Sequence, residues 1–321
     1  MYYLLKSNDT AYLRTFAILV IINSHLDVIY GNSLYASGGA IGNTLFFLLS
    51  GYGLKYSIEK NKIKYIGWIR KRLKGIYPAI WVFNFFLAFY SVFSTVNFEG
   101  WGSFLISFIY TKYWFINAII LFFIFGYPFL RITSVKKLIK WLLALFFIYL
   151  LVYSLLFNIS DSYIIEQLPY KIAFYFLTFL SGILVFHFKE RLNGKKYFVL
   201  LVTLSFLILY LFIKIFLRDS ILFRELQIFQ QIIQLIIAYG IIQINFAFNL
   251  YSRLNKFKFI KDINSIISNI TLEIYIVHGF IIHVLINLNS SIIVKLFLIY
   301  SLSICFALLL KVISHRLTNK I

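Results

Sequence analysis

The sequence is poor in acidic residues, in proline and in cysteine, and these shortages exclude an internal disulfide and the composition of a soluble domain. Its 321 residues include 11 Asp and Glu against 31 Lys and Arg, three prolines and the single cysteine Cys305. One cysteine cannot form an internal disulfide, and it supplies no cysteine metal cluster. No histidine spacing resembles a zinc site either, so we expect no metal. Charged residues of both signs make up only 13% of the chain, which is far below the usage of soluble domains.

Apolar and aromatic residues fill the place of the missing charges. Hydrophobic residues make up 61% of the chain and aromatic residues 21%, and the mean hydropathy is +0.87. A soluble domain of this length is not so apolar, so the lipid bilayer is the expected solvent. The net charge of +20 would suggest nucleic-acid binding in a soluble protein. In a membrane protein it is better explained by basic loops, so we expect no nucleic-acid partner.

Long apolar runs separated by short charged segments predict about ten transmembrane helices. No stretch between them is long enough for a separate soluble domain. The prediction is an all-α, polytopic helical bundle in which residues 1–321 form one membrane domain. The predicted spans are residues 13–30, 40–58, 76–94, 113–131, 140–158, 171–188, 197–217, 227–247, 270–289 and 292–313.

The distribution of Lys and Arg predicts the orientation of these spans. When the segments between spans are assigned to alternate sides, 25 of the 31 basic residues fall on the side of the N-terminus. Cytoplasmic loops are enriched in Lys and Arg, so both termini are expected in the cytoplasm. The segment from Met1 to Lys6 has no basic region and no small-residue cleavage site. We therefore expect no signal peptide and a first helix that remains in the mature protein.

The first predicted span carries an arginine and a histidine separated by ten mostly apolar residues, Arg14 and His25. On a helix these two lie roughly 16 Å apart, about half of a hydrocarbon core. An ionisable residue at that depth is a candidate site residue, and an imidazole with a pKa of about 6.5 suits a general base. The alternative is a polar side chain that hydrogen-bonds between helices. Asp27 is a weak partner, since on a regular helix it faces away from His25.

Polar residues also mark the second and ninth spans. Tyr275 and His278 share one helix face with Thr271, which indicates a cavity wall or hydrogen bonds between helices. Glu273 and His283 fall away from that face.

In the second span, Asn43 and Ser50 are candidates to face a cavity. Gly51 and Gly53 are interpreted as helix-packing residues, because small side chains let helices approach closely.

The predicted cytoplasmic segment after the second span contains a basic cluster that includes Lys71, Arg72 and Lys74. Part of this charge reflects the orientation bias of membrane proteins. The same side chains suit the phosphates of a cytosolic cofactor, because guanidinium and ammonium groups bind phosphate well.

Taken together, these motifs resemble the acyltransferase-3 family of membrane acyltransferases, typified by bacterial enzymes that O-acetylate surface polysaccharides. The resemblance covers nearly the whole chain. Its most specific part is the basic residue, ten residues and histidine of the first helix. Four further segments are similar to family elements, namely Leu45–Tyr52, Lys71–Pro78, Trp114–Asn117 and Leu272–His278. Gly75 stands where the family often has a second arginine, which gives Arg72 more weight than Lys74.

The resemblance implies an O-acetyltransferase in the bacterial inner membrane, with acetyl-CoA as donor. Its acceptor would be a glycan hydroxyl of capsule, O-antigen or a lipid-linked precursor. His25 and Arg14 would be the catalytic residues, and His25 would act as a base or carry the acyl group. Arg14, Lys71, Arg72 and Lys74 would bind the donor. Candidates for the cavity lining are Asn43, Ser50, Trp114, Asn117, Glu273, Tyr275 and His278. Of these, Ser50, Tyr275 or His278 would stabilise the developing oxyanion.

Two other functions fit the composition. A transporter or flippase of lipid-linked sugar or of a small polar solute would also place ionisable residues inside the membrane. However, the sequence has no inverted repeat and no paired Gly or Pro interruptions in its two halves. A non-catalytic membrane component of a polysaccharide assembly complex is the third interpretation. The motifs favour the acyltransferase.

Overall fold

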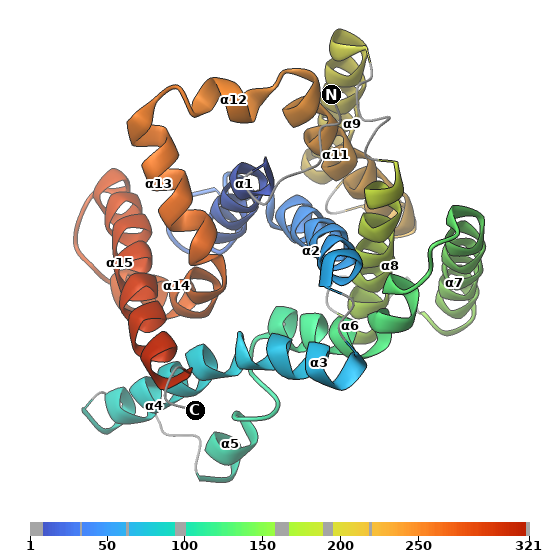
Figure 1. Cartoon of the computed structure of the whole chain (residues 1–321). Helices are drawn as coiled ribbons and strands as arrows, with labels where there is room; N and C mark the ends of the chain where they lie inside the picture. Colours follow the sequence, from blue (N-terminus) through green and yellow to red (C-terminus); the bar gives the residue numbers. More distant parts are fainter. Residues whose placement is uncertain are drawn as a thin grey trace. The chain divides into compact units, whose positions relative to one another are not determined.

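The structure is a computed structural model that describes residues 9–32, 34–61, 64–93, 101–157, 167–188, 195–217 and 220–318. Within these ranges the chain forms helices joined by turns and no strand, so the all-α prediction is confirmed for them. The helices are α1 (Asp9–Ser24), α2 (Gly39–Asn61), α3 (Tyr65–Lys74), α4 (Tyr77–Phe93), α5 (Trp101–Ile106), α6 (Trp114–Leu130), α7 (Val135–Leu156), α8 (Leu168–His187), α9 (Lys196–Phe216), α10 (Ile221–Glu225), α11 (Gln227–Ala247), α12 (Leu250–Leu254), α13 (Lys258–Asn269), α14 (Thr271–Leu285) and α15 (Ile292–Thr318) (Figure 1).

Helices occupy each of the ten predicted ranges, but they differ in length. Among the described residues, six helical segments are long and apolar enough to cross a membrane, and α13 with α14 makes a seventh if the two count as one span. Helices α1 and α6 are shorter apolar helices. The protein is thus a multi-pass helical membrane protein, and ten crossings stay a prediction. Both chain ends lie outside the described residues, and their cytoplasmic location stays a prediction too.

The chain divides into two compact units. Unit 1 consists of Met1–Ile21, Ser37–Lys62 and Gly126–Ser268. Unit 2 consists of Ile22–Ala36, Ile63–Phe125 and Asn269–Ile321. Each is described separately below.

Unit 1 is built around the contact between α2 and α8, which lie side by side in Figure 1. A Cβ atom on Gly51 would overlap the carbonyl of Phe179, and one on Gly182 would overlap the carbonyl of Leu48. The two backbones therefore touch, as small residues allow in membrane helices. The packing role predicted for Gly51 is confirmed. For Gly53 it is wrong, because this glycine is exposed and a Cβ there meets no atom of the described residues within 4 Å.

A buried lysine ties α2 to the end of α6 within unit 1. Lys55 is only 1% exposed, and its Nζ donates hydrogen bonds to the carbonyls of Leu130 and Ile132 at 3.0 and 2.8 Å. It also forms an ion pair of 2.9 Å with Glu59, one helical turn later. A lysine suits this place because the last carbonyls of a helix lack backbone partners and carry partial negative charge.

Unit 2 contains α3, α4, α5, α14 and α15, and α4 and α15 both pack against α14. Aromatic rings of α4 surround Phe280 of α14: the ring centroids of Phe86 and Tyr90 lie 5.3 and 5.0 Å from that of Phe280, in edge-to-face geometry. Such pairs are favourable beyond their buried area because the positive ring edge meets the negative ring face. This contact fixes α14, which carries three candidate site residues, Glu273, Tyr275 and His278.

The first span differs from its prediction over residues 13–30. Helix α1 ends at Ser24, so His25 lies in the turn that follows and not inside a helix. The reason is local chemistry, since Asn, Asp and Gly favour turns. The side chain of Asn23 holds the turn together: its Nδ2 donates to the carbonyl of Tyr35, and its Oδ1 accepts from the Tyr30 hydroxyl, both at 2.8 Å.

Candidate active site

His25 begins the turn after α1, in unit 2. Its backbone N–H donates to the carbonyl of Ile22 at 2.9 Å, which closes the last turn of the helix. The side chain is exposed. Asp27 is also exposed and lies in the same turn. The prediction that Asp27 faces away from His25 assumed a regular helix, and the chain is not helical at these two residues. The end of α1 thus presents an imidazole on a backbone held by the hydrogen bonds of Asn23.

The structure brings His25 together with His278 of α14. Their ring centroids lie 5.1 Å apart, with the ring planes tilted by 51°. His278 is 5% exposed. These two histidines are 253 positions apart in the sequence, and they come from different predicted spans. We call them the histidine pair.

The hydrogen bonds of His278 define the state of its ring. Its Nδ1 lies 2.8 Å from the carbonyl oxygen of Tyr275 and 3.2 Å from that of Ile274. A carbonyl oxygen only accepts, so Nδ1 must carry the hydrogen and donate it. In the neutral ring, Nε2 is then an acceptor with a lone pair. The buried imidazole is therefore oriented by the backbone of its own helix.

Tyr275 extends the site with two further aromatic residues. Its ring centroid lies 5.5 Å from that of His278 and 4.7 Å from that of Phe115. Tyr113 meets Tyr275 edge-on at 6.3 Å. The shared face predicted for Tyr275 and His278 is thus found in the structure. Tyr113 and Phe115 were missed, because nothing in an aromatic-rich sequence distinguishes these two rings from lipid-facing ones.

Trp114 and Asn117, both predicted to line a cavity, support the cluster of Tyr113, Phe115 and Tyr275, which we call the aromatic wall. Trp114 packs edge-on against Phe115, with centroids 5.9 Å apart. Asn117 is 7% exposed. Its Oδ1 accepts from the backbone N–H and the hydroxyl of Thr111 at 3.0 and 3.1 Å, and its Nδ2 donates to the Thr111 carbonyl at 2.6 Å. Asn117 therefore clamps the segment that carries Tyr113.

Glu273 points to a different partner from the histidine pair. Its carboxylate accepts a hydrogen bond from Nζ of Lys311 on α15 at 2.8 Å, and its side chain is 2% exposed. Two residues along a helix turn a side chain by about 200°, so Glu273 faces away from Tyr275. The ion pair links α14 to α15 inside unit 2.

Unit 1 holds the remaining candidates of the first two helices. The backbone of α1 meets that of α2 at Gly42, where a Cβ would lie 2.8 Å from the carbonyl of Ala17. Nε of Arg14 and Oδ1 of Asn43 are buried and have no hydrogen-bond partner among the described residues. A buried polar atom without a partner calls for a water or a ligand. Ser50 instead donates its hydroxyl hydrogen to the carbonyl of Phe46 at 2.8 Å.

The basic cluster divides between two faces of α3. The guanidinium of Arg72 lies over the ring of Trp68, with its Cζ 5.9 Å from the ring centroid. Trp68 is buried and meets Phe123 edge-on at 5.7 Å, so Arg72 is held on the inner face of the helix. Lys71 and Lys74 are exposed. Arg72 is therefore the best-oriented cation of the cluster.

Comparisons with known proteins give one positive result. No curated protein and no solved structure matches the chain significantly. A family model described as an acyltransferase domain matches residues 10–316, which include most of both units and every candidate residue above. Among the described residues, no three His, Cys, Asp or Glu side chains gather closely enough to hold a metal ion. The chain is a membrane protein of the acyltransferase-3 family.

Proposed function

We propose that this protein is an O-acetyltransferase of the bacterial inner membrane. It transfers an acetyl group from cytosolic acetyl-CoA to a hydroxyl of a surface polysaccharide or of its lipid-linked precursor. The family supports acyl transfer in a membrane. The observation that carries the proposal is the histidine pair, in which an exposed imidazole lies 5.1 Å from a buried one.

His25 acts as the general base in this proposal. The acceptor hydroxyl oxygen attacks the thioester carbonyl while His25 removes the hydroxyl proton. The new C–O bond forms the ester, the C–S bond breaks, and the proton on His25 passes to the departing CoA thiolate. The alternative is that His25 first takes the acetyl group itself and then passes it to the acceptor. Incubation with labelled acetyl-CoA alone separates the two, because only the second leaves label on the protein.

His278 supports His25 as a hydrogen-bond acceptor. Its Nδ1–H is engaged by the carbonyls of Tyr275 and Ile274, which leaves the lone pair of Nε2 as its remaining polar function. That lone pair stabilises an N–H of His25, and it does so most strongly when His25 is protonated. His278 in this state does not donate to an oxyanion. Ser50 also has its hydrogen engaged, so Tyr275 is the preferred oxyanion donor of the three candidates.

Donor binding is assigned to the cations of the cytoplasmic segment and of α1. Arg72 is the principal phosphate ligand, because its stacking on Trp68 fixes the guanidinium and planar guanidinium groups bind phosphate in bidentate fashion. Lys71 and Lys74 add charge around the same segment. Arg14 contributes a buried Nε that has no hydrogen-bond partner among the described residues.

The proposal is tested by the O-acetyl content of the cell-surface glycan. Four strains are compared at equal membrane abundance: the intact gene, a deletion, His25→Ala and His283→Ala. His283 is the matched control, because it is an exposed histidine near the end of α14 and has no assigned role. We expect acetylation to be lost in the deletion and in His25→Ala and kept in His283→Ala. Unchanged acetyl content in the deletion strain would refute the function for that glycan.

A further inference from the structure

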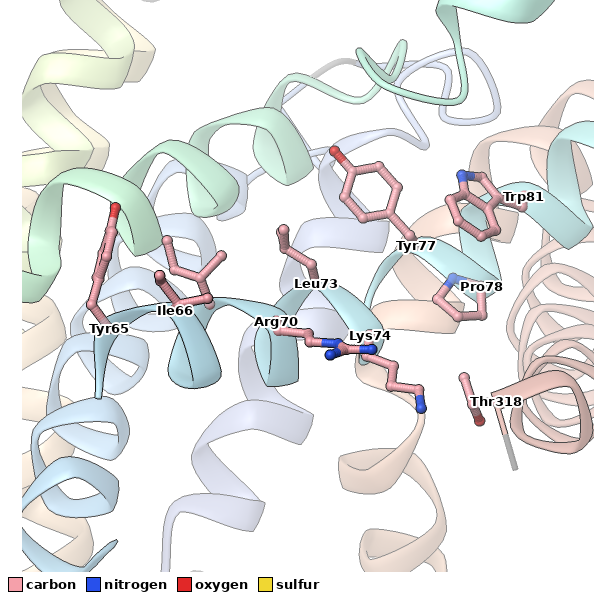
Figure 2. Close-up of a pocket in the computed structure, with 10 residues that line it drawn as sticks. Tyr65, Ile66, Arg70, Leu73, Lys74, Tyr77, Pro78, Trp81 and Thr318 are labelled. Carbon is pink, nitrogen blue, oxygen red and sulfur yellow. The ribbon is translucent and has the colours of Figure 1, made fainter. Parts of the chain in front are cut away.

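Unit 2 contains a pocket whose lining residues, apart from Lys74, have no part in the acyl-transfer proposal. Its volume is about 470 Å³, which lies in the range of about 300–1,000 Å³ typical of small-molecule sites. It is formed by α3, by the beginning of α4 and by the last described residue of α15 (Figure 2). The lining residues are Tyr65, Ile66, Ile69, Arg70, Leu73, Lys74, Tyr77, Pro78, Trp81 and Thr318.

The walls of this pocket suit a hydrocarbon chain. Apart from Arg70, Lys74 and Thr318, its lining is aliphatic or aromatic. Ile66 is 80% exposed and Trp81 is 40% exposed, so the wall continues onto an apolar outer surface. An acyl chain covers such a wall without leaving a polar group unpaired. Trp81 is itself fixed, because its indole N–H donates to the carbonyl of Phe108 at 3.1 Å.

The two charged residues of the pocket suit an anion. Arg70 and Lys74 are one helical turn apart on α3, and both are exposed. In Figure 2 both side chains run toward the end of α3 where Pro78 and Thr318 lie. None of the lining residues is acidic, and neither cation forms an ion pair among the described residues. Two like charges at this spacing repel each other, and an anion between them removes the repulsion.

These cations are separate from the residue that leads the donor-binding proposal. Arg72 is held over Trp68 on the inner face of α3, whereas Arg70 is two positions earlier and therefore about 200° around the helix. Lys74 is the one residue shared by the pocket and the proposed donor-binding cluster. A ligand of the pocket thus meets Arg70 without meeting the stacked face of Arg72.

We propose that this pocket binds one anionic phospholipid, with an acyl chain against Ile66, Ile69 and Trp81 and the phosphate between Arg70 and Lys74. Basic pockets between membrane helices recognise anionic head groups in this way. Trp and Tyr at the rim suit the level of the head groups, where one end of the ring is apolar and the other meets water. The inference concerns binding only, so it holds whether or not the chain transfers acetyl groups.

The test is a lipid titration of the purified full chain. Delipidated protein in detergent is titrated with phosphatidylglycerol and with phosphatidylcholine of the same acyl chains, and bound lipids are counted by native mass spectrometry. We expect one phosphatidylglycerol to bind at concentrations where phosphatidylcholine does not. Arg70→Gln should weaken that binding about tenfold, as loss of a charge-assisted hydrogen bond does. Arg131→Gln, the same change at an exposed arginine outside the pocket, should leave it unchanged.

A second variant tests the apolar lining of the pocket without changing its charge. Ile69→Trp fills the pocket and should also weaken binding of phosphatidylglycerol, at an unchanged midpoint of thermal unfolding. Equal binding of the two lipids, or equal losses in Arg70→Gln and Arg131→Gln, would overturn the proposal. Displacement of phosphatidylglycerol by equimolar inorganic phosphate or coenzyme A would also overturn it, because the site would then belong to a soluble phosphate ligand.

Discussion

Replacement of Lys311 by methionine reveals what the Glu273 carboxylate does. The two groups lie 2.8 Å apart, the side chain of Glu273 is 2% exposed, and that of Lys311 is 43% exposed. An exposed ion pair contributes about 0–1 kcal/mol, and breaking a buried pair from one side costs about 3–5 kcal/mol. Since only the lysine is screened by solvent, we expect Lys311→Met to destabilise the protein by about 1–3 kcal/mol.

The double substitution gives the decisive comparison. Glu273→Gln removes the charge that Lys311→Met leaves unpaired, so the double variant should recover most of the lost stability. The four proteins of the cycle are unfolded by heat in the same detergent, and each is assayed for acetyl transfer. We expect the double variant to lie within about 1 kcal/mol of wild type and to keep its activity, because the pair links α14 to α15 and does not take part in the chemistry.

Two results would refute this reasoning. If the two single changes were additive, the ion pair would contribute nothing to stability. If the double variant were stable but inactive, Glu273 would take part in the reaction, and Glu273 would become the candidate for the acidic partner of His25.

Three further predictions follow from the contacts within each unit. Gly51→Ala and Gly182→Ala should each lower thermal stability by about 1–3 kcal/mol, since the added Cβ overlaps a backbone carbonyl. Gly53→Ala should raise thermal stability slightly, because a Cβ there meets no atom within 4 Å among the described residues; a loss as large as at Gly51 would contradict the packing account. Arg72→Ala should raise the KM for acetyl-CoA about tenfold with kcat nearly unchanged, as loss of a phosphate contact does; an unchanged KM would remove Arg72 from donor binding. Asn117→Ala should lower kcat, because the hydrogen bonds between Asn117 and Thr111 that hold the segment of Tyr113 are lost. A kcat equal to that of wild type would show that the aromatic wall does not serve the reaction.

The sequence predicted much of the helical scaffold because hydrophobic run length is a direct physical requirement of the bilayer. It predicted the end of the first helix poorly. Apolar residues continue past Ser24, and only the side-chain hydrogen bonds of Asn23 to Tyr30 and Tyr35 show why the chain turns there. The apolar pattern alone carries no record of such bonds.

The candidate site was predicted residue by residue and not as an arrangement. His25 and His278 were identified from separate motifs, and their contact follows only from the tertiary structure. Tyr113 gave no signal because tyrosines occur throughout the chain, 24 in all. The partner of Glu273 could not be predicted either, because the sequence does not indicate that Lys311, thirty-eight residues later on α15, lies beside Glu273 on α14.

The most direct test of the central claim is the rate of acetyl transfer by the purified protein with His25 replaced. Wild type, His25→Gln and the control His283→Gln are reconstituted in liposomes with labelled acetyl-CoA and a glycan acceptor. Loss of a general base lowers the rate by about 10²–10⁴-fold, so we expect that loss for His25→Gln and a wild-type rate for His283→Gln. A His25→Gln protein that is folded and transfers acetyl groups at the wild-type rate would contradict the account.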